Sequence, residues 1–267
     1  MGKKRNWPAI YLSIMFVILY APIFYLMFYS FNSGGTMYGF EGFTFDYYLE
    51  VFQNTRLLII VLNTVIIALL SAVISTIIGV FGAMAIMYVK KQQTKNTLLS
   101  LNNVLIVSPD VIIGASFLIL FTFIGIKLGF ASVLIAHIAF SVPIVVLMVL
   151  PKLQEMSPTL IDAARDLGAS RMDILTKIIL PYITPGIYAG FFMALTYSLD
   201  DFAVTFFVTG NGFSTLSVEI YSLARQGISM EINALSTLIF LVTLSLVAGY
   251  YFISKKAVGM AGMGVRK

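Results

Sequence analysis

The chain has 267 residues, of which 59% are hydrophobic and only 11% are charged, whereas soluble globular domains average about 25% charged residues. This composition excludes a soluble globular protein, and the absence of cysteine and the single histidine argue against disulfides, thiol catalysis and metal sites. The net charge is +5, but the position of charges matters more than their sum in a membrane protein, so we expect no nucleic-acid partner.

Six segments are long and apolar enough to cross a membrane as helices, which takes about 20 residues each. They are residues 8–31, 58–89, 99–126, 130–150, 183–209 and 234–254. The first lacks a small-residue cleavage site, so we interpret it as a retained anchor rather than a signal peptide. The sequence therefore predicts an all-α integral membrane protein, surrounded by lipid, with a single domain over residues 1–267.

The basic residues predict the orientation of these spans. All but three of the 17 Lys and Arg residues fall in one alternating set of loops; the exceptions are Arg56, Lys127 and Arg225. Loops rich in Lys and Arg stay on the cytoplasmic side. We therefore expect six transmembrane helices with both termini cytoplasmic, and we place residues 151–182 in the cytoplasm as well.

Aromatic and acidic residues adjoin the start of the second span. Tyr47 and Tyr48 lie beside Asp46 and Glu50 in "GFTFDYYLEVF". Aromatic faces next to carboxylates suit organic cations. The alternative is an ordinary belt of aromatic residues at the membrane interface.

The third span contains an acidic residue, Asp110, in "VSPDVIIG". An ionisable group inside a membrane is costly, so it is a functional candidate by default. Pro109 removes a backbone donor, which is tolerated where helices line a cavity. The alternative is that Asp110 caps a helix that restarts after the proline.

The cytoplasmic segment between the fourth and fifth spans begins with a helix signal, in which Ser157 is the N-cap and Pro158 the first helical residue. Gly168 is placed to end this helix as a C′ glycine. One apolar face is expected from residues at positions i, i+4 and i+7, namely Leu160, Ala164 and Leu167.

A second short helix follows the glycine. Ser170 and Asp173 form an S-x-x-D capping box, and Pro181 is expected to end the pattern before the fifth span. The result is a helix, a glycine turn and a helix, too short and polar to span a membrane. Such an element either lies on the lipid surface or binds a cytoplasmic partner.

Two adjacent acids, Asp200 and Asp201, lie late in the fifth span, in "TYSLDDFAVTFFVTG". Ser198, Asp201 and Thr205 are spaced i, i+3 and i+7, so one polar stripe faces something other than lipid. Neighbouring carboxylates repel each other unless a cation lies near, and an amine would serve. The alternative is structural, with one carboxylate capping or packing and the other facing water.

Three further ionisable residues are notable. Glu219 and Glu231 bracket a segment that could be an outer gate or a simple connector. His137, in "LIAHIAF", is interpreted as a hydrogen-bonded interior histidine.

The segment "DAARDLGASRMDILTKIILP" resembles the EAA loop of ABC importer permeases, whose pattern is E-A-A-x3-G-x9-I-x-L-P. The only departure is Asp for Glu at the first position, which keeps the carboxylate. The matching residues are Asp162, Ala163, Ala164, Gly168, Ile178, Leu180 and Pro181.

The resemblance implies the ABC type I importer permease fold with cytoplasmic EAA coupling helices at about residues 153–181, which dock on an ATPase. It implies that ATP and Mg are bound by that partner and that this chain is not an enzyme. The sequence agrees, because it has no G-x-x-x-x-G-K-[ST] phosphate loop.

Softer segments, among them "SPDVI" and "DDFAVTFFVTG", look like those of spermidine/putrescine importer permeases in the cytoplasmic (inner) membrane. This likeness implies polyamine transport by two different permeases, two copies of a cytoplasmic ABC ATPase and an extracytoplasmic polyamine-binding protein. The residues assigned to the substrate path are Asp110, Ser198, Asp200, Asp201, Glu219 and Tyr47.

Two alternatives stay open at this point. One is an ABC importer permease for another small solute, such as an anion, a sugar or thiamine; an anion path should place basic residues in the spans, where only acids occur. The other is a channel or carrier without an ATPase, for which the EAA-like loop would have no purpose.

Overall fold

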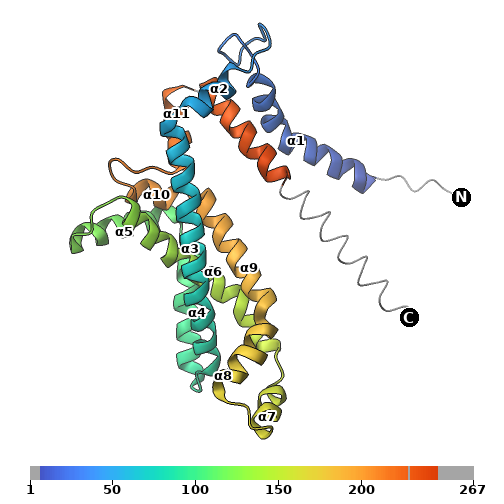
Figure 1. Ribbon diagram of the computed structural model, residues 1–267, viewed down its shortest axis with the longest axis vertical. Coiled ribbons are helices and arrows are strands. Elements are labelled where there is room, and N and C mark those ends of the chain that lie inside the picture. The colour runs from blue at the N-terminus through green and yellow to red at the C-terminus, as the bar shows by residue number, and fades with distance from the viewer. Residues whose placement is uncertain (1–6, 228, 246–267) are drawn as a thin grey trace, which may run out of the picture. The chain divides into compact units, whose positions relative to one another are not determined.

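The computed structural model describes residues 7–227 and 229–245, and it confirms the all-helical fold expected from the sequence (Figure 1). The chain divides into two compact units, one of Met1–Leu58 with Ile220–Lys267 and the other of Ile59–Glu219. The first unit therefore combines the two ends of the chain, and the second contains its middle.

The first unit contains α1 (Trp7–Tyr29), α2 (Asp46–Gln53) and an apolar helix over Met230–Ser245. Asn32 organises the loop between α1 and α2, because its buried amide donates to backbone carbonyls and accepts the N–H of Glu41. Asn54, which follows α2, donates a 2.8 Å hydrogen bond to the carboxylate of Glu231. These bonds connect segments from opposite ends of the sequence within one unit.

The second unit is a bundle of helices. In chain order they are α3 (Thr55–Tyr88, which begins in the first unit), α4 (Gln92–Val107), α5 (Asp110–Ile124), α6 (Phe130–Glu155), α7 (Pro158–Asp166), α8 (Arg171–Ile174), η1 (Leu175–Ile179), α9 (Leu180–Asp200), α10 (Ala203–Val208) and α11 (Leu216–Gln226, which continues into the first unit). In Figure 1, α3, α4, α6 and α9 run side by side, with α7 and α8 at one end of them and α5 and α10 towards the other.

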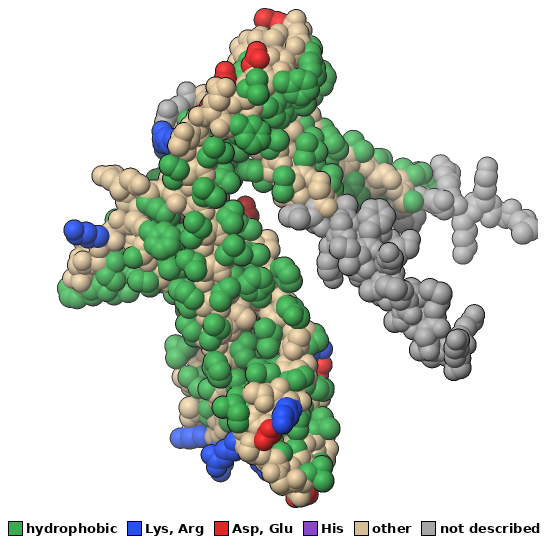
Figure 2. Space-filling model, in the orientation of Figure 1, with side chains coloured by type: hydrophobic (Ala, Val, Ile, Leu, Met, Phe, Trp, Pro, Cys, Tyr) green, Lys and Arg blue, Asp and Glu red, His purple; other side chains and the backbone are tan. Residues whose placement is uncertain are grey.

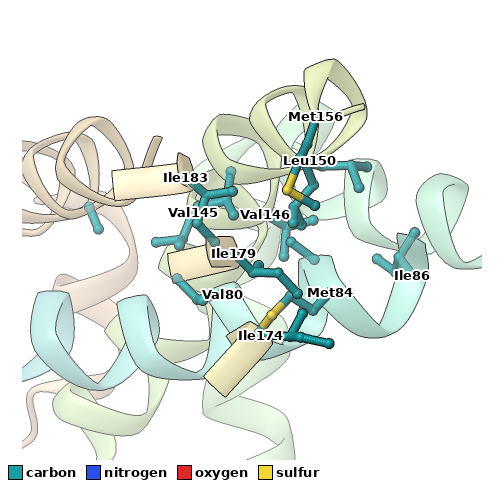
Figure 3. Packing of buried hydrophobic residues seen from close by; sticks show 14 of the residues in the cluster. Val80, Met84, Ile86, Val145, Val146, Leu150, Met156, Ile174, Ile179 and Ile183 are labelled. Atoms are coloured by element: carbon teal, nitrogen blue, oxygen red, sulfur yellow. The ribbon is translucent and has the colours of Figure 1, made fainter. Parts of the chain in front are cut away.

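A large cluster of buried hydrophobic residues holds α3, α6 and α9 together (Figure 3). Val80 and Met84 come from α3, Val145 from α6 and Ile183 from α9. Glycine permits the close approach: a Cβ atom built on Gly79 of α3 would lie 2.6 Å from the Cβ atom of Val145. Small residues at such contacts are typical of membranes, where van der Waals packing drives helix association.

Four helices of the described residues are long and apolar enough to cross a membrane: Ala9–Tyr29, Thr55–Tyr88, Phe130–Glu155 and Arg171–Asp200. Hydrophobic side chains cover the outside of the second unit, while Lys and Arg gather at the end that carries α7 (Figure 2). This is the separation of apolar and basic surface that a membrane imposes.

The third predicted span, residues 99–126, is broken in two, as the alternative of a helix that restarts after Pro109 anticipates. The chain forms α4 and α5, which are inclined by 104° and separated by a break at Ser108 and Pro109. Proline disfavours helical backbone in the residue before it, and Ser108 is accordingly extended, with ψ of 140°.

The fifth predicted span, residues 183–209, is wrong at both ends. The helical run begins at Arg171, passes through α8, η1 and α9, and ends at Asp200. Pro181 does not stop it, because the π-helical turn η1 precedes the proline and changes the hydrogen-bond pattern where its N–H is missing. The run stops instead at Asp201, whose backbone is extended.

The last predicted span, residues 234–254, is described only in part. Met230–Ser245 forms an apolar helix, and residues 246–254 lie outside the described residues, as do the basic residues near both termini. The number of six spans, the cytoplasmic termini and the single domain over residues 1–267 therefore stay predictions.

Candidate functional site

A cavity of about 240 Å³ lies in the second unit where α9 ends, α10 begins and α5 starts. We call it the acidic pocket, and its lining residues are Asp110, Tyr197, Asp200, Asp201, Phe202 and Ala203. Three acids that the sequence analysis selected from distant segments thus share one pocket. None of the lining residues is basic.

Packing of α10 against α5 brings the two walls of the acidic pocket together. A Cβ atom built on Gly114 of α5 would lie 3.0 Å from the Cα atom of Val204 and 2.8 Å from the ring of Phe207. Glycine at this position lets α10 lie directly on α5, which places the start of α5 beside the end of α9.

Asp110 is the first residue of α5, and Pro109 rather than Asp110 occupies the N-cap position. Its carboxylate accepts a 2.6 Å hydrogen bond from the hydroxyl of Tyr197. The break before Pro109 thus turns an in-span acid towards the pocket, at a helix N-terminus that favours negative charge.

The two adjacent aspartates have different surroundings. Asp201 is buried, and its carboxylate accepts hydrogen bonds from the backbone N–H groups of Val204 and Thr205 and from the Thr205 hydroxyl, the last at 2.6 Å. Asp201 therefore caps the start of α10 while lining the pocket, and Asp200 is the exposed member of the pair. This arrangement matches the structural alternative for Asp201.

A buried polar network lies behind the acidic pocket. The imidazole of His137 hydrogen-bonds through Nδ1 to Ser198 at 2.6 Å and through Nε2 to Thr205 at 2.8 Å. The hydroxyl of Ser71 on α3 donates to Ser198 at 3.0 Å. The predictions of an interior histidine and of a polar stripe turned away from lipid are both confirmed.

Two residues of the predicted substrate path lie elsewhere. Tyr47 is on α2, within the first unit, and Glu219 is a buried residue of α11 that does not line the acidic pocket. The sequence analysis missed Tyr197, although it lies three and four residues before the aspartate pair, a spacing that puts side chains on one helix face.

The residues that resemble the EAA loop form the predicted helix, glycine turn and helix. Gly168 has φ of +81°, and the N–H groups of Gly168 and Ala169 bond back to the carbonyls of Arg165 and Ala164, as in a Schellman motif. The Ser170 hydroxyl accepts the N–H of Asp173, as its capping box predicts. Both predicted signals are confirmed.

The apolar face predicted for α7 is wrong. Ala164 is buried against the cluster of Figure 3, with Ile161, Ile178 and Leu180 partly buried beside it. Leu160 is half exposed and Leu167 is 88% exposed. Asp162 and Ala163 are also exposed, and the Asp162 carboxylate pairs with Arg165 at 3.3 Å.

Comparison with known proteins identifies the family. Residues 75–257 match the family model described as "Binding-protein-dependent transport system inner membrane component". The chain belongs to this family. Its members are transport subunits of the inner membrane, so the chain is a multi-pass inner-membrane transport component, and the alternative of a carrier outside this class is set aside.

Curated members of the family resemble nearly the whole chain. The spermidine/putrescine transport system permease protein PotC of Haemophilus influenzae is 35% identical over 92% of this chain and 95% of its own. The putrescine transport system permease protein PotI of Escherichia coli K12 is 32% identical over 88% of this chain and 86% of its own.

A solved structure supports the fold. A bacterial ABC transporter involved in the import of the acidic polysaccharide alginate has a TM-score of 0.72 at 19% identity, over 95% of this chain and 96% of that one. The ABC type I permease fold expected from the EAA-like loop is confirmed. Among the described residues no cluster of His, Asp and Glu could hold a metal ion.

Proposed function

We propose that this chain is the pore-forming permease subunit of an ATP-driven importer that moves polyamines, spermidine or putrescine, across the cytoplasmic membrane. One observation carries the proposal: three carboxylates from two distant segments of the chain converge on one pocket that has no basic residue in its lining. The spermidine/putrescine permease named above, similar over nearly its whole length, supports the same substrate class.

The pocket has the chemistry that a flexible organic cation needs. Asp110 and Asp200 supply negative charge, and Asp201 adds a fixed carboxylate to the wall. The rings of Tyr197 and Phe202 offer apolar and cation–π contact to methylene groups and ammonium groups. An anionic solute would meet repulsion here, since the wall carries acids and no basic group.

The remaining residues of the predicted path have indirect roles in this proposal. Ser198 supports the pocket from behind through His137. We keep Tyr47 and Glu219 as path residues on the basis of the sequence alone.

We further propose that the EAA-like segment docks on a separate ATPase, which binds ATP and Mg, while this chain performs no covalent chemistry. Exposed apolar side chains at its tip, Leu167 and Met172, support a docking role. The helical run Arg171–Asp200 then connects the docking segment to the acidic pocket over roughly 45 Å. The other partners are a second homologous permease, a second ATPase copy and an extracytoplasmic polyamine-binding protein.

Uptake of labelled spermidine and putrescine tests the substrate. Cells that lack this permease receive the intact chain or Asp200→Asn, with the cognate partners present. We expect the intact chain to restore uptake and Asp200→Asn to raise KM about tenfold, because it removes an exposed charge and no structural bond. Glu41→Gln, a change of an exposed acid in the loop before α2, is the control for a general loss of charge.

Each result has a distinct meaning. Absence of polyamine uptake by an assembled complex that hydrolyses ATP would reject the substrate while leaving the family intact. Equal KM values for Asp200→Asn and the intact chain would reject the acidic pocket as the cation path.

A further inference from the structure

His137 lies behind the acidic pocket and is not among its lining residues. It lies in the first third of α6, has no exposed surface, and has hydrogen-bond partners at both ring nitrogens. Burial of a polar ring in a membrane helix is costly unless each polar atom is satisfied. The network around His137 satisfies both nitrogens and connects α3, α6, α9 and α10.

The hydrogen bonds of this network run in one direction. Ser198 lies between Nδ1 of His137 and the hydroxyl of Ser71, whose single proton is shared between Ser198 and the carbonyl of Ala68. Thr205 donates its hydroxyl proton to Asp201, so it accepts the Nε2–H of His137. The network thus assigns the Nε2–H tautomer and ends on a carboxylate of the pocket wall, and such aligned chains strengthen each bond.

His137 also supports the opposite wall. Its ring lies 4.9 Å from the ring of Phe140, which in turn meets Tyr197 edge to face with a centroid distance of 4.9 Å. Tyr197 donates to Asp110. The Nε2 atom of His137 also lies 3.5 Å from Oδ2 of Asp201. One buried side chain therefore reaches Asp201 both directly and through a hydroxyl, and reaches Asp110 through two rings.

We propose that His137 is the positioning residue of the acidic pocket, which holds the carboxylates of Asp201 and Asp110 in the geometry that receives a cationic solute. The inference rests on the proposed function for the identity of the solute. In this proposal His137 sets the distance between the negative charges of the pocket and does not itself contact the solute.

The test compares three changes on α6 in the full complex. His137→Phe keeps a ring beside Phe140 but loses both hydrogen bonds, and His137→Gln retains a donor that can reach Thr205. Ser132→Ala is the matched control, because Ser132 is also buried on α6 and donates a 2.7 Å bond to the carbonyl of Val208 on α10.

The electrostatic potential inside the acidic pocket can be measured by chemical labelling, without polyamine. The chain has no cysteine, so Ala203→Cys places a single thiol in the pocket lining. The rate of labelling by cationic aminoethyl methanethiosulfonate, divided by that of its neutral methyl analogue, reports the local negative potential. We expect His137→Phe to lower this ratio about fivefold, His137→Gln to restore most of it, and Ser132→Ala to leave it unchanged.

Spermidine uptake provides the second readout. We expect His137→Phe to raise KM about tenfold, with a smaller change in the maximal rate per assembled complex. A labelling ratio that is unchanged in His137→Phe, or lowered equally by Ser132→Ala, overturns the inference. A ratio that responds as expected in a complex without polyamine uptake supports the inference and rejects the proposed solute.

A second pair of variants keeps the test decisive if His137→Phe does not assemble. Thr205→Val lacks the hydroxyl between His137 and Asp201, and Thr205→Ser retains it. We expect only the valine to lower the labelling ratio. Equal ratios for the two variants overturn the hydroxyl link between His137 and Asp201 on which the inference rests.

Discussion

At the scale of single residues, the aspartate pair shows how adjacent identical side chains take different tasks. Asp201 ends α9, caps α10 and has three donors, while the neighbouring Asp200 is exposed at the pocket. A buried carboxylate is tolerated only when donors replace the lost water. The charge that a solute can meet without disturbing the fold therefore belongs to Asp200 and Asp110.

Tyr197→Phe tests the tyrosine that the sequence analysis missed. The change keeps the ring that packs on Phe140 and removes the 2.6 Å hydrogen bond to Asp110. Because a bond to a charged group is stronger than a neutral one, we expect KM for spermidine uptake to rise about tenfold. Tyr188→Phe, at an exposed position of the same helix, should leave KM unchanged. An equal rise in KM for both variants would contradict the role of Tyr197.

Gly168→Ala tests the turn of the docking segment. Gly168 has φ of +81° and open space around a built Cβ atom, so alanine adds only backbone strain, about 1–2 kcal/mol. We expect ATP hydrolysis stimulated by the loaded binding protein to fall severalfold, because α7 and α8 no longer hold their relative geometry.

Gly125→Ala is the matched control for this change. Gly125 follows α5 with φ of +77°, again with open space, so its replacement adds comparable strain away from the docking segment. Equal losses of stimulated hydrolysis in the two variants would mean general instability and would contradict a specific role of the Gly168 turn in coupling.

At the scale of helices, local signals were predictable and the pocket was not. Gly168 and the Ser170 cap act within a few residues, so the sequence alone indicates them. The ends of the fifth span were wrong, because hydrophobicity does not register the break at Asp201, whereas Pro109 did indicate the break in the third span. The meeting of Asp110 with the aspartate pair depends on α10 packing against α5, a contact between distant segments.

Gly79→Ala and Gly82→Ala test helix packing at two positions of α3. An added Cβ atom at Gly79 would lie 2.6 Å from Val145 of α6, whereas at Gly82 it would lie 3.6 Å from Val146, an ordinary contact. We expect Gly79→Ala to lower the melting temperature of the purified complex by several degrees, since overpacking costs about 1–3 kcal/mol. Gly82→Ala should leave it unchanged or raise it; the reverse order would disprove this packing.

At the scale of the whole molecule, one helical run links the docking segment to the acidic pocket. Arg171–Asp200 begins beside the glycine turn and ends at the carboxylate pair. A π-helical turn near Pro181 lets the run continue without the N–H that proline lacks. Movement of a docked ATPase would therefore act on the pocket through a continuous element rather than through a flexible loop.

The orientation of this run can be tested with single cysteines in the cysteine-free chain. Leu167→Cys lies on the exposed tip between α7 and α8, and Asn211→Cys lies in the exposed loop after α10, beyond the other end of the run. Because Lys and Arg collect near α7, we expect a membrane-impermeant maleimide to label only Asn211→Cys in intact spheroplasts and only Leu167→Cys in inside-out vesicles. The assembled ATPase should then protect Leu167→Cys from labelling. Labelling of Leu167→Cys from outside would show that the predicted orientation is the reverse of the true one. Full labelling of Leu167→Cys in the assembled complex would show that this tip is not part of the docking surface.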